Sequence, residues 1–78
     1  MVFDEQELFK LIATILKVDI SKIDPDLTVG DIPEWDSLAH INLFSAIEKK
    51  YQLSIEIDQA IELESVEDFI YFLSENSG

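Results

Sequence analysis

The sequence predicts an all-α fold, and three observations carry that prediction. Apolar residues return at intervals of three and four in three separate stretches of the chain, which is the periodicity of helices with one buried face. Glycine and proline occur only twice each, so few turns interrupt these stretches. The hydrophobic share of 47% is too high for a disordered chain. With 78 residues, we expect one domain spanning residues 1–78.

The first helix is predicted to begin after Asp4, which is placed to act as its N-cap. Glu7 falls at the third helical position, as in a capping box, and Phe3 and Leu8 have the spacing of a hydrophobic staple. The helix should end at about residue 17 or 18. Its acidic polar face has the wrong charge for a helix that lies on a membrane. Its apolar stripe consists of Leu8, Leu11, Ile12, Ile15 and Leu16.

Residues 19–36 lose the helical periodicity and predict a long loop, which is unusual in so small a domain and often functional. Turn signals occur at residues 24–26 and 30–31, and we expect one helical turn over residues 21–24. A calcium loop starting at Asp24 is excluded, because Val29 stands at its sixth position and Trp35 at its twelfth. The apolar residues expected to pin the loop over the end of the helices are Ile20, Ile23, Leu27, Val29 and Ile32.

The second helix is predicted from Ser37 to about residue 50. Asp36 is its expected N-cap, since its carboxylate can accept the free amide hydrogens of the first turn. Leu38 is expected to turn inward and fix the helix on the core. The expected apolar stripe consists of Leu38, Ile41, Phe44 and Ile47, widened by Leu43, Ala46 and Tyr51.

The last third of the chain predicts a connector and two further helices. Apolar and polar residues alternate over residues 52–58, but a single strand has no partner, so we expect an extended connector with its apolar side chains turned inward. A short helix is predicted over residues 58–63 with Asp58 as its cap. Ser65 opens a second capping pattern, and the final helix should run to about residue 75. The apolar residues of the connector are Leu53, Ile55 and Ile57.

The composition excludes several classes of function. The absence of cysteine excludes disulfides, zinc–thiolate sites and catalysis by a thiol of the chain, and the cytoplasm is the expected compartment. A net charge of −12 repels nucleic acids and anionic membranes and favours basic protein surfaces, unless the acids are only a solubilising shell. No apolar run reaches membrane-spanning length, and the first residues do not form a signal peptide. We expect a monomer whose partners are proteins.

Ser37 is the residue whose position suggests chemistry. A hydroxyl at the first helical position lies near free amides and the positive end of the helix dipole, which suits a phosphate ester. Nothing nearby in sequence would activate it as a nucleophile, because Asp36 and His40 on the same helix cannot form the chain of hydrogen bonds of a triad. We therefore expect no catalytic residue, no metal site, and a polar His40 beside Ser37. Trp35 is interpreted either as a binding aromatic or as packing against a helix end.

The order of these features resembles the acyl carrier protein family along nearly the whole chain. The residues that carry the resemblance are Trp35-Asp36-Ser37-Leu38, Ile47-Glu48-Lys49-Lys50-Tyr51, Leu53-Ser54-Ile55 and Ser65-Val66. The resemblance implies a small bundle of three long helices and one short helix, with a long loop between the first two. It implies that Ser37, flanked by Asp36 and Leu38, carries covalent 4′-phosphopantetheine, which a phosphopantetheinyl transferase takes from coenzyme A. It also implies an acyl thioester on that arm, presented to enzymes that act in trans.

Departures from the family pattern bear on the partners. Carriers of primary fatty acid synthesis usually have acids just after the serine, whereas the matching positions here are Ala39, Asn42 and Lys49, and only Glu48 keeps the pattern. The chain therefore looks like a discrete specialised carrier. Two alternatives stay open: an aminoacyl or peptidyl carrier of a nonribosomal or D-alanine transfer system, and an acidic interaction module without an arm. The residues expected to contact the transferase and the acyl-loading and acyl-using enzymes, through basic surfaces on those partners, are Asp31, Glu34, Trp35, Ala39, Asn42, Ser45, Glu56 and Glu62.

Overall fold

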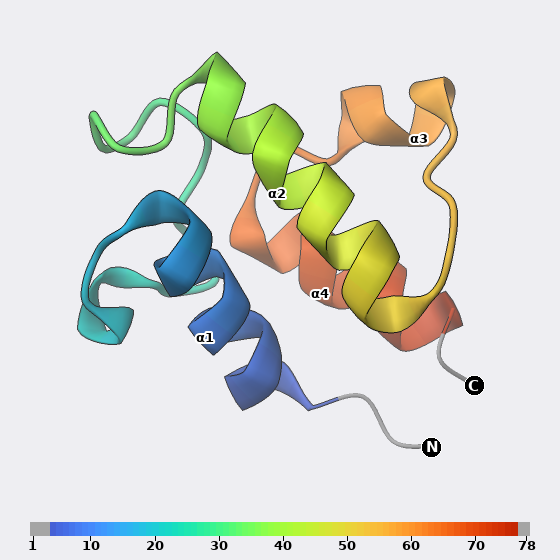
Figure 1. Ribbon diagram of the computed structural model, residues 1–78, viewed down its shortest axis with the longest axis horizontal. Coiled ribbons are helices and arrows are strands. Elements are labelled where there is room, and N and C mark those ends of the chain that lie inside the picture. The colour runs from blue at the N-terminus through green and yellow to red at the C-terminus, as the bar shows by residue number, and fades with distance from the viewer. Residues whose placement is uncertain (1–3, 77–78) are drawn as a thin grey trace.

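In the computed structural model, residues 4–76 are described, and along them the chain forms four α-helices and one 3₁₀ helix. The elements are α1 (Glu5–Leu16), η1 (Ile20–Lys22), α2 (Ser37–Tyr51), α3 (Ile57–Glu62) and α4 (Val66–Asn76). The long helices α1, α2 and α4 pack together, and the short α3 lies to one side of them (Figure 1). This arrangement confirms the predicted all-α fold with three long helices, one short helix and a long loop between the first two. No helix within residues 4–76 has the length and apolar character needed to cross a membrane.

Local capping interactions set the helix ends. The Asp4 carboxylate accepts a hydrogen bond from the Gln6 amide at 2.9 Å, as expected for the N-cap of α1. Phe3, the other half of the predicted staple, lies outside the described residues. At the start of α4, the Asp68 amide donates to the Ser65 hydroxyl at 3.1 Å and the Ser65 amide donates to the Asp68 carboxylate at 3.2 Å. This reciprocal pair is a capping box and confirms the predicted start of the last helix.

The core is built from apolar residues of the three long helices and of the loop. Its largest fully buried side chains are Trp35, Phe69, Leu8, Ile12, Leu43, Ile47, Leu73 and Val66. Among the described residues no polar or charged residue is fully buried. The chain therefore gains its stability mainly by removing apolar surface from water.

The long loop is bonded to the segment that enters α4. The Val29 amide donates to the Glu64 carbonyl oxygen, and the Val66 amide donates to the Leu27 carbonyl oxygen, both at 2.9 Å. Leu27 is buried, as the sequence predicted for the loop anchors, whereas Ile20 on η1 is exposed. These bonds join residues 35 and 39 positions apart in the sequence and fix the loop that leads into α2.

Two predictions for the connector and α3 are wrong. Glu56, and not Asp58, is the N-cap residue of α3, so the cap lies two residues before the predicted one. Ile57 is consequently the first helical residue, and its side chain is 81% exposed instead of turned inward. The physical reason is the change of period. Once the chain is helical, Ile57 shares a face with Ile61 four residues later, and that face points to solvent.

Candidate functional site

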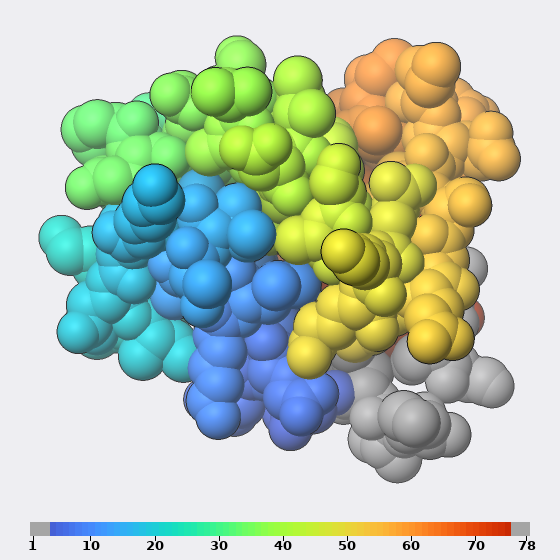
Figure 2. All heavy atoms as spheres, viewed as in Figure 1, coloured from blue at the N-terminus to red at the C-terminus, as the bar shows by residue number. Residues whose placement is uncertain are grey.

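Ser37 is the first residue of α2, and its side chain is exposed. The carboxylate of Asp36 accepts a hydrogen bond from the Ala39 amide at 2.8 Å, which confirms Asp36 as the N-cap. The first turns of α2, green in Figure 2, form part of the molecular surface. A group attached to the Ser37 hydroxyl would therefore extend into solvent.

The electrostatic setting of Ser37 suits an anionic ester. The amides of the first helical turn have no carbonyl partner within the helix, and together with the helix dipole they place partial positive charge at this end of α2. Asp36 uses its carboxylate on the Ala39 amide, so the amides of Ser37 and Leu38 stay available to a phosphate oxygen. Lys49 and Lys50 lie at the opposite end of the helix.

Trp35 is a core residue, and its prediction as a partner contact is wrong. Its side chain is 0% exposed, and its indole Nε1–H donates a hydrogen bond to His40 Nδ1 at 3.0 Å. The cause is the local turn: the Trp35 amide donates to the Ile32 carbonyl oxygen at 3.1 Å, and the Gly30 amide donates to the Trp35 carbonyl oxygen at 2.9 Å. These bonds direct the indole into the core and so anchor the residues just before Ser37.

His40 is half-buried, and its ring packs against aromatic side chains. Its ring centroid lies 4.6 Å from that of Phe44 and 6.1 Å from that of Phe69. Because the indole N–H can only donate, His40 Nδ1 must accept, and the ring proton of the neutral form is on Nε2. Burial lowers the pKa of His40, although a hydrogen bond to the Leu63 backbone and the charge of Glu64 oppose the shift.

This arrangement leaves His40 without a role as a base for Ser37. His40 Nδ1 accepts the hydrogen bond from the Trp35 indole, so this nitrogen is not free to take a proton from Ser37. The serine hydroxyl is on the solvent side of α2, whereas the imidazole packs against aromatic rings of the interior. The geometry of a nucleophile activated by a hydrogen-bonded histidine is absent from this pair.

Leu38 does not turn inward, and neither does Ile41. Their side chains are 68% and 60% exposed, whereas Leu43 and Ile47 form the buried face of α2. A helix turns about 100° per residue, so Leu38 lies about 140° from Leu43 around the axis and Ile41 about 160°. The same arithmetic places Ala39 about 40° from Leu43, which explains why Ala39 packs against the core instead of facing outward.

The remaining predicted partner residues are all exposed, and Asp31 and Glu56 also have a structural role, Glu56 as the cap residue of α3. Asn42 and Ser45 on α2 are exposed, and so are the acids Glu34, Glu56 and Glu62. The acid Asp31 has a structural role, because its carboxylate accepts a hydrogen bond from the Thr28 amide at 2.9 Å and closes the loop. Within residues 4–76, no three or more histidine or acidic side chains gather into a set that could hold a metal ion.

Sequence reasoning missed the exposed apolar residues of α2 and α3. The pairs Leu38 and Ile41 on α2 and Ile57 and Ile61 on α3 are all more than half exposed. A signal was present, because the predicted stripe of α2 held seven apolar residues and was too wide for one buried face. Only the packing shows which side of that stripe is covered.

Comparison with known proteins places these features in a family. Residues 6–73 match the family described as "Phosphopantetheine attachment site". The chain is 32% identical over 77 residues to a protein named "Acyl carrier protein" from Streptomyces coelicolor, with 92% of this chain and 84% of that protein covered. It is also 32% identical over 71 residues to the protein of that name from Rickettsia canadensis, covering 91% and 83% of the two chains. A third similar protein of that name, from Porphyromonas gingivalis, is 29% identical over 72 residues, with 92% of both chains covered.

Proposed function

Because this chain belongs to the acyl carrier protein family, whose shared element is a phosphopantetheine attachment site, we propose that it is a carrier and that Ser37 is the attachment residue. The cofactor that family membership implies is covalently attached 4′-phosphopantetheine. Once attached, the arm supplies a terminal thiol that holds an acyl group as a thioester. In this proposal the chain presents that group to enzymes acting in trans and does no chemistry of its own.

The exposure of Ser37 at the start of α2 is the observation that supports this most. The hydroxyl is open to a large modifying enzyme, and the free amides of the first turn suit the negative charge of a phosphodiester. Asp36 fixes that turn through the Ala39 amide, and the buried Trp35 holds the preceding loop in place. The residues present therefore fit the group.

The side chains around Ser37 also support a carrier instead of an enzyme. His40, the single histidine of the sequence, accepts a hydrogen bond from the Trp35 indole. No base is needed in the chain itself, since a phosphopantetheinyl transferase would supply the catalysis of attachment. The role of the chain is then to keep the hydroxyl in a fixed and accessible position.

We further propose that the partner enzymes dock over the exposed start of α2. Leu38 and Ile41 are large apolar side chains on the open face of this helix, and such residues give close contact when a partner covers them. The exposed carboxylate of Glu34 lies just before the helix, and Glu56 and Glu62 belong to the α3 region. These acids would attract a basic partner surface over a longer range.

Intact mass spectrometry tests the attachment. The unmodified protein, incubated with coenzyme A and a phosphopantetheinyl transferase, should gain the mass of one phosphopantetheine group. The Ser37→Ala variant should gain nothing, and Ser45→Ala, which changes another exposed serine of α2, should be modified like the wild type. Circular dichroism should show that both variants keep their helices.

Two outcomes would contradict the proposal. Modification of Ser37→Ala would place the attachment at another residue. No modification of the wild type by several transferases would favour the acidic interaction module without an arm.

A further inference from the structure

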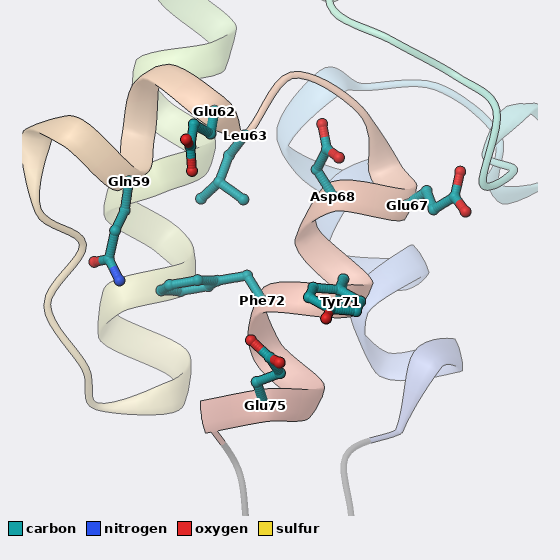
Figure 3. A pocket seen from close by; sticks show the side chains of 8 residues that line it. All are labelled: Gln59, Glu62, Leu63, Glu67, Asp68, Tyr71, Phe72 and Glu75. Carbon is teal, nitrogen blue, oxygen red and sulfur yellow. The ribbon is translucent and has the colours of Figure 1, made fainter.

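A groove between α3 and α4 has no part in the proposed carrier function. Its volume is about 470 Å³, within the range of about 300–1,000 Å³ that is typical of ligand pockets. One wall comes from Gln59, Glu62 and Leu63 at α3, and the other comes from α4 (Figure 3). The groove includes no residue of α2, the helix that begins with Ser37. A ligand or protein segment bound here would leave Ser37 uncovered.

Aromatic side chains of α4 form the apolar part of the groove. The Phe72 ring extends from α4 toward α3, and the Tyr71 ring projects from α4 in a different direction (Figure 3). Tyr71 is 66% exposed, which is unusual for so large a ring in a domain with a well-formed core. An exposed aromatic ring beside an apolar floor offers a face on which a planar group can stack.

The rim of the groove is acidic. Glu62, Glu67 and Glu75 are exposed, whereas Asp68 uses its carboxylate on the Glu64 and Ser65 amides at 3.1 and 3.2 Å. In the part of the chain that the structure describes, the one salt bridge joins Lys50 to Glu7, far from this rim in sequence. Within residues 4–76, no salt bridge joins the groove's carboxylates to a lysine, and no lysine lines the groove.

We propose that this groove is a second docking site and that it takes a segment of a partner protein carrying an arginine next to an apolar residue. A guanidinium can stack on the Tyr71 ring while it donates to carboxylates of the rim, and an ammonium does this less well. The neighbouring apolar residue would lie against Phe72. The chain itself has no arginine, and its net charge of −12 opposes binding of a second copy.

The consequence is that two partners can engage the carrier at once. One partner holds the α3–α4 groove, while an enzyme that uses the arm docks over the start of α2. This goes beyond the proposed carrier function, because it adds a second docking site that leaves Ser37 uncovered.

Fluorescence anisotropy with a defined probe tests the inference. The probe is a fluorescein-labelled hexapeptide of alternating arginine and leucine, and the control peptide has citrulline in place of arginine. The double variant Glu67→Gln/Glu75→Gln removes two charges from the rim. The matched control, Glu5→Gln/Asp19→Asn, removes two exposed charges at α1 and η1, away from the groove, and asparagine keeps the N-cap acceptor of η1. Tyr71→Ala removes the ring at constant charge.

We expect the rim variant to raise the Kd for the arginine peptide at least about tenfold, and the control variant to raise it less than about threefold. Tyr71→Ala should also weaken binding, the citrulline peptide should not bind, and amide resonances of α3 and α4 should shift in the complex. Modification of the rim variant by a transferase should be unchanged. Equal losses in the rim and control variants, or resonance shifts confined to α2, would overturn the proposal.

Discussion

Replacing Trp35 tests the claim that the core anchors the residues before Ser37. The side chain is 0% exposed and donates a hydrogen bond to His40. Truncating such a residue to alanine costs about 3–5 kcal/mol of unfolding free energy. A domain of this length has only about 4–12 kcal/mol in total. Trp35→Ala should therefore lose a large part of its stability. The comparison variant is Trp35→Phe, which keeps a ring and loses the N–H donor.

The phenylalanine variant should lose about 1–2 kcal/mol, since a hydrogen bond contributes about 1 kcal/mol and the smaller ring leaves a gap. Each kcal/mol lowers the Tm of a small domain by about 4–8 °C. Urea denaturation followed by far-UV circular dichroism measures these losses. Tyr71→Ala is the matched control, because it removes an exposed aromatic ring and should change stability by less than about 0.5 kcal/mol.

Two results would refute the reasoning. One is a stability loss for Trp35→Ala no larger than that of Tyr71→Ala. The other comes from the wild type, in which Trp35 is the single tryptophan. If acrylamide quenched its fluorescence as efficiently as that of free tryptophan, the side chain would be in solvent and could not anchor the loop.

Three further predictions concern pH, salt and docking. Burial lowers the pKa of His40 below 6.5. As the pH falls, His40 is therefore protonated in the unfolded chain before it is protonated in the folded one. The contribution of neutral His40 to the unfolding free energy is complete above about pH 6.5 and is lost as the pH falls through the pKa of the folded state. His40→Gln should therefore flatten the fall of stability below pH 6.5. An unchanged fall in that variant would contradict a lowered pKa for His40. Added salt or magnesium should raise the Tm, since the one salt bridge within residues 4–76 leaves most of the negative charge uncompensated, and a flat response would mean that the acids are too dispersed to matter. Ile41→Ala should weaken binding of a partner enzyme at least about fivefold without changing the salt dependence of association. Glu34→Lys should slow association and flatten its salt dependence. The exposed Ile20→Ala is the control, and an equal effect of Ile20→Ala and Ile41→Ala would remove α2 from the docking surface.

The sequence by itself determined where the three long helices begin. The N-caps Asp4 and Asp36 and the capping pattern at Ser65 act through hydrogen bonds to amides two or three residues away. Such bonds need no distant partner, so the residue types and their spacing were sufficient. The position of Ser37 at the first turn of α2 follows from the same local interaction.

The tertiary structure decided which side of each apolar segment is covered. The stripe of α2 had more apolar residues than one face can bury, and packing covers Leu43 and Ile47 while it leaves Leu38 and Ile41 in solvent. The direction of Trp35 depends on a turn of the loop and on His40, which the first turns of α2 place against its indole. Burial is a property of contacts between distant segments, and a local pattern can say that a residue is apolar without saying what will lie against it.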